Sequence, residues 1–339
     1  MLEVSPGPLC EAYDLAMLDL DGVVYVGGVA VPRAPEALSA ARGAGMRVAF
    51  ITNNASRPPD TVAEHLTELG VSATRSDVVT SAQAAARVLR DRLGERARVV
   101  VLGAEGLLQA LSEESLVAVT VEDDADALVT GYGPEVRWKD IMHGAVRVRD
   151  GLWWVASNTD MTLPTPYGPA PGHGVLVETL RRFTGVDPVV AGKPARPLLD
   201  ETIRRVGGER PLMVGDRLDT DIAGAHNTGV PSLLVMTGVT TAAELVAAAP
   251  GLRPTYLSPD LDGLSAEHPV PTLDDGVATL GGWRASVVGA RLEVKGDGDV
   301  ADWWRVVATA AWAYLDDSGR PADISGLDVP VADGGSGGL

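Results

Sequence analysis

Pairs of carboxylate side chains follow two apolar runs of the sequence. Asp19 and Asp21 close the run LAMLDLD, and Asp216 and Asp221 come after the run LMVG. Side chains two residues apart in a strand point to the same face, so Asp19 and Asp21 would project together. An isolated pair of this kind also suits a strand-to-turn junction in which Asp accepts backbone hydrogen bonds. Several carboxylates converging on one crevice repel unless a cation neutralises them, and hard oxygen ligands favour Mg²⁺.

Polar residues also end two further apolar runs. Thr52, Asn53 and Asn54 follow RVAFI, where a hydroxyl and backbone N–H groups at a strand-to-helix turn suit a phosphate. Lys193 ends the run PVVAGK, and it is one of only three lysines in a chain with 25 arginines. We interpret a lysine kept at a strand end as a compact positive point charge, while a surface role stays open.

The elements that must position these residues alternate between short apolar strands and Ala/Leu-rich helices over roughly the first 265 residues. This alternation is typical of βαβ units around a parallel sheet, where ligands bind at the carboxyl ends of the strands. The strands are predicted at 15–20, 47–52, 212–215 and 232–236, and the helices near 34–43, 59–70 and 219–228. A strand near 188–193 is expected to return to this same sheet.

A second series of α/β elements interrupts the first and is predicted to form an inserted domain. It includes the runs ARVVVLG, DALVTGYG, LWWVASN and VLVETLRRFTG. Beyond it, a hairpin at 282–294 and an apolar-faced helix at 299–317 predict a small appended module. The fold class is therefore α/β, a Rossmann-like parallel-sheet core with an inserted α/β cap domain and a small C-terminal α+β module. The predicted boundaries are 1–82 with 187–265 for the core, 83–186 for the cap, 266–332 for the module and 333–339 for a flexible tail.

The chain resembles the haloacid dehalogenase superfamily of phosphatases, in the branch with a large α/β cap. That branch contains p-nitrophenyl-phosphatase-like, phosphoglycolate, pyridoxal-phosphate and glycerol-phosphate phosphatases. The resemblance covers roughly residues 14–260 and rests on the segments LDLDGVVYVG, FITNNASRPP, TSAQAAA, SNTDMTLPT, AGKP and VGDRLDTDIAGA. The chain departs from the pattern of the branch at Ala55, where the branch often has Ser, and at Gly133, where an acidic residue is frequent.

The resemblance implies a Mg²⁺-dependent phosphomonoesterase that works through an aspartyl-phosphate. Asp19 would be the nucleophile, and Asp21 the general acid and base. The metal would be held by Asp19, the backbone carbonyl of Asp21 and Asp216, with Asp221 orienting its waters.

The remaining roles also follow from the resemblance. Thr52, Asn53, Asn54 and Lys193 would bind the phosphoryl oxygens, and Thr52 and Lys193 count among the catalytic residues. Substrate choice would then fall to the cap, because the core reads only the phosphate.

In the cap, Asn158, Asp160 and His173 are the candidates for contact with the leaving group, although a lone His in a Gly-rich loop is often a solvated turn residue. The favoured substrate is glycerol 3-phosphate, a preference that rests on the resemblance of high-Ala/Arg chains with a C-terminal extension to that subgroup. The alternatives are 2-phosphoglycolate, pyridoxal phosphate and a nucleotide. A binding protein for phosphorylated metabolites without turnover is a further alternative.

Composition limits the other classes of function. The 28 basic residues against 46 acidic ones give a formal net charge of −18, which disfavours nucleic acid and anionic membranes as partners. The single cysteine, Cys10, and the lack of a signal-like N-terminus predict a cytoplasmic protein. No 18-residue apolar run is present. The expected partner is a small-molecule phosphate ester, and a homodimer stays open.

Two other kinds of enzyme lack their motifs here. A nicotinamide-dependent oxidoreductase requires GxGxxG after the first strand, and the sequence does not have it there. A P-loop nucleotidase or kinase requires GxxxxGK[ST], and no such string is present in the sequence. The module at 266–332 loosely resembles part of an acetyltransferase fold. It has no R/Q-x-x-G-x-G/A loop for a pyrophosphate, so a structural lid, a dimer contact or a vestigial domain is the expectation.

Overall fold

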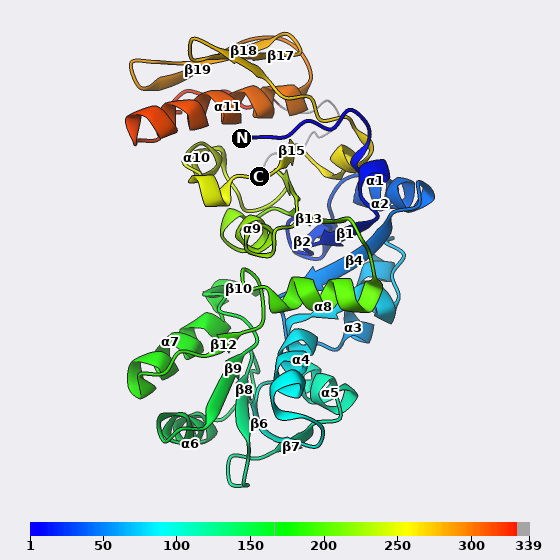
Figure 1. Cartoon of the computed structure of the whole chain (residues 1–339), viewed down its shortest axis with the longest axis vertical. Helices are drawn as coiled ribbons and strands as arrows, with labels where there is room; N and C mark the ends of the chain where they lie inside the picture. Colours follow the sequence, from blue (N-terminus) through cyan, green and yellow to red (C-terminus); the bar gives the residue numbers. More distant parts are fainter. Residues whose placement is uncertain (166, 331–339) are drawn as a thin grey trace. The chain divides into compact units, whose positions relative to one another are not determined.

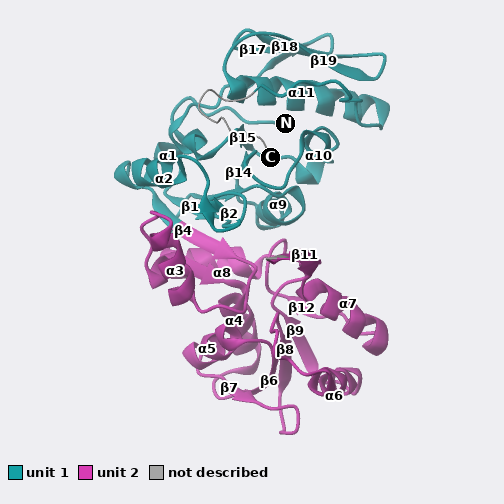
Figure 2. Ribbon diagram, turned by 180° about the vertical axis from the view of Figure 1, so that it is seen from behind, with its two compact units in different colours: residues 1–48, 208–339 teal, residues 49–207 magenta. Residues whose placement is uncertain are grey.

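A computed structural model describes residues 1–165 and 167–330, so the tail predicted at 333–339 lies outside the described residues (Figure 1). The chain divides into two compact units (Figure 2). Unit 1 contains residues 1–48 and the chain from 208 onward, and unit 2 contains residues 49–207. The α/β fold class is confirmed. The compact units follow other boundaries than the predicted domains, which stay a prediction.

The first part of unit 1 is a group of buried, largely apolar parallel strands. β1 (Leu15–Leu18) pairs with β13 (Pro211–Gly215), β13 with β14 (Ser232–Val235), and β14 with β15 (Tyr256–Ser258). All the residues of β1, β14 and β15 are buried, as expected for parallel strands that are covered on both faces. The other strands and α-helices of this part are α1 (Leu9–Ala12), β2 (Tyr25–Val26), β3 (Val29–Ala30), α2 (Ala34–Gly43), α9 (Ala223–Thr228) and α10 (Ala242–Val246). A short π-helical segment, Leu218–Ile222, precedes α9 and contains Asp221.

The C-terminal part of unit 1 is an antiparallel sheet with one long helix on its face. The sheet has the order β16 (Thr272–Asp274), β17 (Val277–Leu280), β18 (Trp283–Val288) and β19 (Arg291–Gly296). The helix α11 (Val300–Ser318) runs along this sheet (Figure 1). Residues 303–312 of α11 are all buried, because the helix contacts the sheet and also α10 and β15. One apolar core therefore runs through both parts of unit 1.

Unit 2 holds two parallel arrangements of strands. β4 (Arg47–Thr52), which begins just before the unit boundary, pairs with β5 (Val78–Thr80). A separate five-stranded parallel sheet has the order β12 (Val189–Val190), β9 (Trp153–Ala156), β8 (Ala127–Thr130), β6 (Arg98–Leu102) and β7 (Val117–Val119). The helices are α3 (Pro59–Glu68), α4 (Ser81–Leu93), α5 (Glu105–Glu113), α6 (Trp138–Arg149), α7 (His173–Thr184) and α8 (Pro197–Val206), and β10 (Thr162–Thr165) forms a hairpin with β11 (Gly168–Pro171).

The sequence-based expectation for the strand near 188–193 was wrong. The strand β12 covers only Val189 and Val190, and it pairs with Val155 and Ala156 of β9 in the five-stranded sheet. Apolar character alone does not tell which of two parallel sheets a short run joins, because short apolar runs form strands in both sheets. Lys193 follows β12 by three residues, just beyond the edge of the five-stranded sheet.

No helix among the described residues combines the length and the apolar character needed to cross a membrane.

Candidate active site

Unit 1 gathers three carboxylates at the carboxyl ends of β1 and β13. One oxygen each from Asp19, Asp216 and Asp221 lies within 4.8 Å of the others. Asp216 and Asp221 are fully buried, and Asp19 is half-buried. Buried carboxylates this close repel one another strongly, and a divalent cation relieves that repulsion. The all-oxygen donor set fits a hard cation such as Mg²⁺.

Backbone N–H groups hold two of these carboxylates in place. Oδ2 of Asp221 accepts hydrogen bonds from the N–H groups of Asp216 and Arg217, each at 3.1 Å. Oδ2 of Asp216 accepts one from the N–H of Val239 at 2.6 Å. Asp219, in contrast, forms an ion pair with Arg217 and lies exposed, so it belongs to the surface.

The turn after β1 requires glycine at position 22. Gly22 has φ +86°, and a Cβ there would lie 2.3 Å from Oδ2 of Asp216. The turn is closed by a hydrogen bond from the N–H of Gly22 to the carbonyl of Tyr25 at 2.8 Å. Asp21 is exposed in this turn and is not one of the three clustered carboxylates. Its assignment as a metal ligand through the backbone stays a prediction.

Unit 2 builds a second polar cluster around the side-chain amide of Asn53. Its Oδ1 accepts from the N–H of Lys193 at 2.8 Å, and its Nδ2 donates to the carbonyl of Lys193 at 3.0 Å. The same Nδ2 donates to Oδ1 of Asp160, also at 3.0 Å. Asn53 thus fixes both backbone groups of Lys193, whose side chain is 1% exposed.

The turn after β4 places the other predicted phosphate ligands. Thr52 is buried, and its Oγ1 accepts a hydrogen bond from the N–H of Asn54 at 3.1 Å. Asn54 is exposed and uses its Oδ1 to accept from the N–H and the hydroxyl of Ser56. The side chain of Asn54 therefore shapes the turn.

The cap candidates are linked to Asn53 by hydrogen bonds, Asn158 directly and His173 through Asn158. Nδ2 of Asn158 donates to the carbonyl of Asn53 at 2.7 Å, and Nδ1 of His173 lies 2.9 Å from the carbonyl of Asn158. Burial lowers the pKa of His173 to about 4, so the imidazole is neutral at pH 7. Unit 2 thus brings Asn53, Asp160, Lys193, Asn158 and His173 into one hydrogen-bonded group.

Three residues of these clusters carried no assigned role in the sequence analysis. The hydroxyl of Ser81 donates to the carbonyl of Asn53, and it lies in the segment TSAQAAA, which contributed to the family resemblance without a role. After β14, Thr237 donates to the carbonyl of Gly22 at 2.6 Å. Val239 binds Asp216 as described above. The loop that contains Thr237 and Val239 follows the apolar strand β14. Loops at the carboxyl ends of parallel strands bind ligands, so this position could have indicated a role for the loop.

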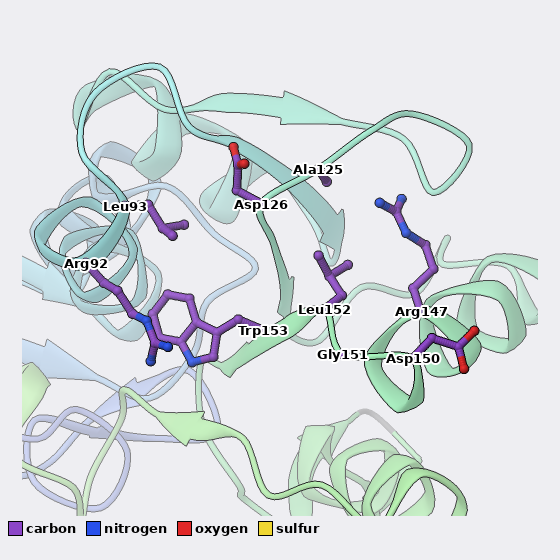
Figure 3. A pocket seen from close by; sticks show the side chains of 9 residues that line it. All are labelled: Arg92, Leu93, Ala125, Asp126, Arg147, Asp150, Gly151, Leu152 and Trp153. Carbon is purple, nitrogen blue, oxygen red and sulfur yellow. The ribbon is translucent and has the colours of Figure 1, made fainter.

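A pocket of about 550 Å³ opens elsewhere in unit 2. Its charged side chains do not converge on one point (Figure 3). The guanidinium of Arg92 lies over the ring of Trp153 at 4.2 Å, and Arg147 donates to the carbonyls of Val121 and Asp123. Because Arg92 stacks on Trp153 and Arg147 is bonded to backbone carbonyls, we assign this pocket no role in the reaction.

Two family models match separate parts of the chain. A model described as haloacid dehalogenase-like hydrolase matches residues 16–116, and a second one, described as HAD-hydrolase-like, matches residues 190–264. The D-glycerol 3-phosphate phosphatase of Mycobacterium tuberculosis is 43% identical over 326 residues, which cover 93% of this chain and 89% of that protein. A 5'-nucleotidase of Bacillus subtilis is 34% identical over 232 residues, covering 68% of this chain and 90% of the relative.

Solved structures show the same similarity. The crystal structure of a glycerol phosphate phosphatase from Mycobacterium tuberculosis in complex with magnesium matches with a TM-score of 0.83 and 41% identity, over 93% of this chain and 94% of that one. A 4-nitrophenylphosphatase from Thermotoga maritima matches with a TM-score of 0.70 and 29% identity, over 76% and 98% of the two chains.

Proposed function

Because this chain belongs to the haloacid dehalogenase-like hydrolases and is a phosphatase of that family, we propose that it hydrolyses glycerol 3-phosphate with Mg²⁺ as its cofactor. The observation that carries the proposal is the cluster of Asp19, Asp216 and Asp221, whose oxygens lie within 4.8 Å of one another. A cluster of hard oxygen donors is the site that Mg²⁺ prefers.

Asp19 and Asp21 are the proposed reacting groups of unit 1. The carboxylate of Asp19 attacks phosphorus, the bond from phosphorus to the ester oxygen breaks, and Asp21 gives its proton to the departing alkoxide. In the second step Asp21 takes a proton from a water that attacks the aspartyl-phosphate, which releases inorganic phosphate and restores Asp19. Bound Mg²⁺ would neutralise negative charge on the phosphoryl oxygens.

The exposure of the two acids supports this division of roles. Asp19 is half-buried beside two buried carboxylates, while Asp21 lies exposed in the turn that Gly22 makes possible. An acid that must exchange protons with water gains from an exposed position, and a nucleophile gains from a fixed one.

Unit 2 contributes the proposed phosphate-binding groups. Thr52 offers a hydroxyl, the turn that contains Asn53 and Asn54 offers backbone N–H groups, and Lys193 offers a positive charge. The side chain of Asn53 supports this role because it binds both the N–H and the carbonyl of Lys193 and so holds its backbone in place. Catalysis of phosphoryl transfer depends mainly on such positioning and on charge.

The domain boundaries, the partner and the location of the protein are also proposals. Because β12 pairs with β9 in the five-stranded sheet, we propose a core of 1–82 with 191–265, a cap of 83–190 and a module of 266–332. The net charge of −18 supports a small phosphate ester as partner in place of nucleic acid or membrane, and the single cysteine supports a cytoplasmic location.

The preference for glycerol 3-phosphate is supported by the Mycobacterium tuberculosis phosphatase, which is similar over 93% of this chain. The Bacillus subtilis 5'-nucleotidase, similar over 68% of the chain, makes a nucleoside monophosphate the second candidate. The two differ in the leaving group, which is a three-carbon alcohol in one case and a nucleoside in the other.

Release of inorganic phosphate from a panel of esters tests the proposal. The panel contains glycerol 3-phosphate, 2-phosphoglycolate, pyridoxal phosphate and a nucleoside monophosphate, each with Mg²⁺ and with a chelator. We expect the highest kcat/KM for glycerol 3-phosphate, with loss of activity in chelator and in Asp19→Asn. That variant keeps the side-chain volume and removes the nucleophile. Full activity of Asp19→Asn would exclude the covalent route, and a different best ester would exclude the substrate.

A further inference from the structure

The buried imidazole of His173 has one bonded and one unbonded nitrogen. Nδ1 faces the carbonyl oxygen of Asn158 at 2.9 Å. A carbonyl only accepts, so Nδ1 carries the proton and donates. Nε2 then holds a lone pair, and it has no hydrogen-bond partner among the described residues. A buried acceptor without a partner disfavours folding by about 1–3 kcal/mol. Stability alone therefore does not explain a histidine at position 173, and a functional role would.

The start of α7 is packed tightly against the loop that contains Asn158. The N–H of Gly174 donates to the carbonyl of Asp160 at 2.8 Å, and the N–H of Gly172 donates to that of Met161 at 2.9 Å. A Cβ at Gly174 would lie 2.2 Å from the carbonyl oxygen of Thr159, so only glycine allows this approach. His173 lies between these two glycines, and its hydrogen bond completes the contact between helix and loop.

From this loop, hydrogen bonds continue to the proposed phosphate-binding groups. Nδ2 of Asn158 donates to the carbonyl of Asn53 at 2.7 Å. Asn53 in turn binds the N–H and the carbonyl of Lys193. Each bond in this series is made by a side chain that is at most 8% exposed, where water competes little for its groups.

We propose that His173 is a positioning residue for phosphate binding, which acts by donating Nδ1–H to Asn158 and thereby orients Asn53 and Lys193. The proposal rests on the proposed function, because it assumes that Asn53 and Lys193 bind phosphate. It differs from direct contact with the leaving group, since Nε2 is buried and Nδ1 is occupied. A positioning role makes a distinct prediction, namely that binding of the phosphate itself depends on residue 173.

Competitive inhibition by inorganic phosphate measures this dependence. In His173→Leu we expect the inhibition constant for phosphate to rise about five- to tenfold, the effect of losing one buried hydrogen bond. The variant His173→Asn places an amide N–H close to the position of Nδ1, and we expect it to restore phosphate binding to within about twofold of the wild type. The Mg²⁺ concentration for half-maximal activity should not change in either variant, because the clustered carboxylates belong to unit 1.

Two further variants separate positioning from a general loss of structure. His143→Leu is the matched control: it replaces a half-buried histidine of α6, beside Glu122, and should leave phosphate inhibition unchanged. Asn158→Ala keeps His173 but removes the next donor of the series, and it should weaken phosphate binding as His173→Leu does. If His173→Leu does not fold, as judged by circular dichroism, Asn158→Ala and His173→Asn decide the question.

The outcomes are separable. An unchanged inhibition constant in His173→Leu, with an altered ranking of esters, would overturn the proposal in favour of leaving-group contact. An unchanged constant and an unchanged ranking would leave His173 with a structural role only. If the wild type releases phosphate from no ester, the proposed function fails. Calorimetric titration with inorganic phosphate then decides the proposal by itself, because equal binding by wild type and His173→Leu, or binding by neither, overturns it.

Discussion

Stability of this chain should fall in mildly acidic solution because of a second buried histidine, His268. Its Nε2 lies 2.8 Å from the carbonyl of Gly263 and so donates to it, which leaves Nδ1 to accept from Nη2 of Arg305 at 3.2 Å. Burial, aided by the positive charge of Arg305, lowers the pKa of His268 to about 4. A proton on Nδ1 would face another N–H donor, so the folded state resists protonation.

The size of the effect follows from the two pKa values. An unfolded histidine titrates near 6.5, so between pH 6.5 and 4 the unfolded chain binds a proton that the folded chain does not. The free energy of unfolding is therefore fully retained above pH 6.5 and falls as the pH drops toward 4. At about 1.4 kcal/mol for each pH unit, the loss from His268 between pH 7 and pH 5 is about 2 kcal/mol.

The variant His268→Gln isolates this contribution. Glutamine keeps an N–H donor for Gly263 and does not titrate. Urea unfolding followed by tryptophan fluorescence at pH 7, 6 and 5 gives the free energy of unfolding of both proteins. We expect the wild type to lose about 2 kcal/mol more than the variant between pH 7 and pH 5. His173 is present in both proteins and cancels. Parallel pH profiles would refute the reasoning, whatever the stability of the variant at pH 7.

Three further changes probe the site and the core. Asp221→Asn removes a carboxylate that accepts from the N–H groups of Asp216 and Arg217, and should raise the Mg²⁺ concentration for half-maximal activity by about tenfold or more; an unchanged Mg²⁺ titration would contradict this. Gly22→Ala forces a Cβ to 2.3 Å from Oδ2 of Asp216, and kcat should fall at least about tenfold, with the thermal midpoint lowered as well; wild-type kinetics would show that the turn adapts. Trp312→Phe removes the indole N–H that donates to the carbonyl of Leu245 at 2.8 Å, and urea unfolding should show a loss of about 1–3 kcal/mol. Equal midpoints would argue that water replaces the bond.

The strands that precede the site were predictable because their local signal is unambiguous. The run RVAFIT was predicted at 47–52, and β4 covers Arg47–Thr52. Five of its six residues are buried, so the apolar run and the strand coincide. The order of strand ends then predicts which polar residues gather at the sheet edge, as Asp19 and Asp216 do.

Contacts between distant parts of the chain were less accessible to prediction. Asn53 and Lys193 are 140 residues apart, and the side-chain amide of Asn53 binds the backbone of Lys193. A single contact of this kind produces no periodic pattern in the sequence, so the sequence does not reveal it. The pairing of β12 with β9 failed for a related reason, since a two-residue strand carries too little pattern to select its sheet. For His173, the sequence identified the residue, but its bond to the carbonyl of Asn158 depends on a loop fold that sequence does not encode locally.

The division of the chain also bears on the order in which its parts fold during synthesis. Unit 2 is one continuous segment, 49–207, whereas unit 1 needs both the first 48 residues and the chain from 208 onward. In β1, Leu15 pairs with Pro211, a partner that leaves the ribosome almost 200 residues later. Domains tend to fold as units during synthesis. Unit 2, including the hydrogen bonds of Asn53 to Lys193, can therefore form before β13 is available to pair with β1. The carboxylate cluster of unit 1 can be completed only later, once Asp216 and Asp221 have been synthesised.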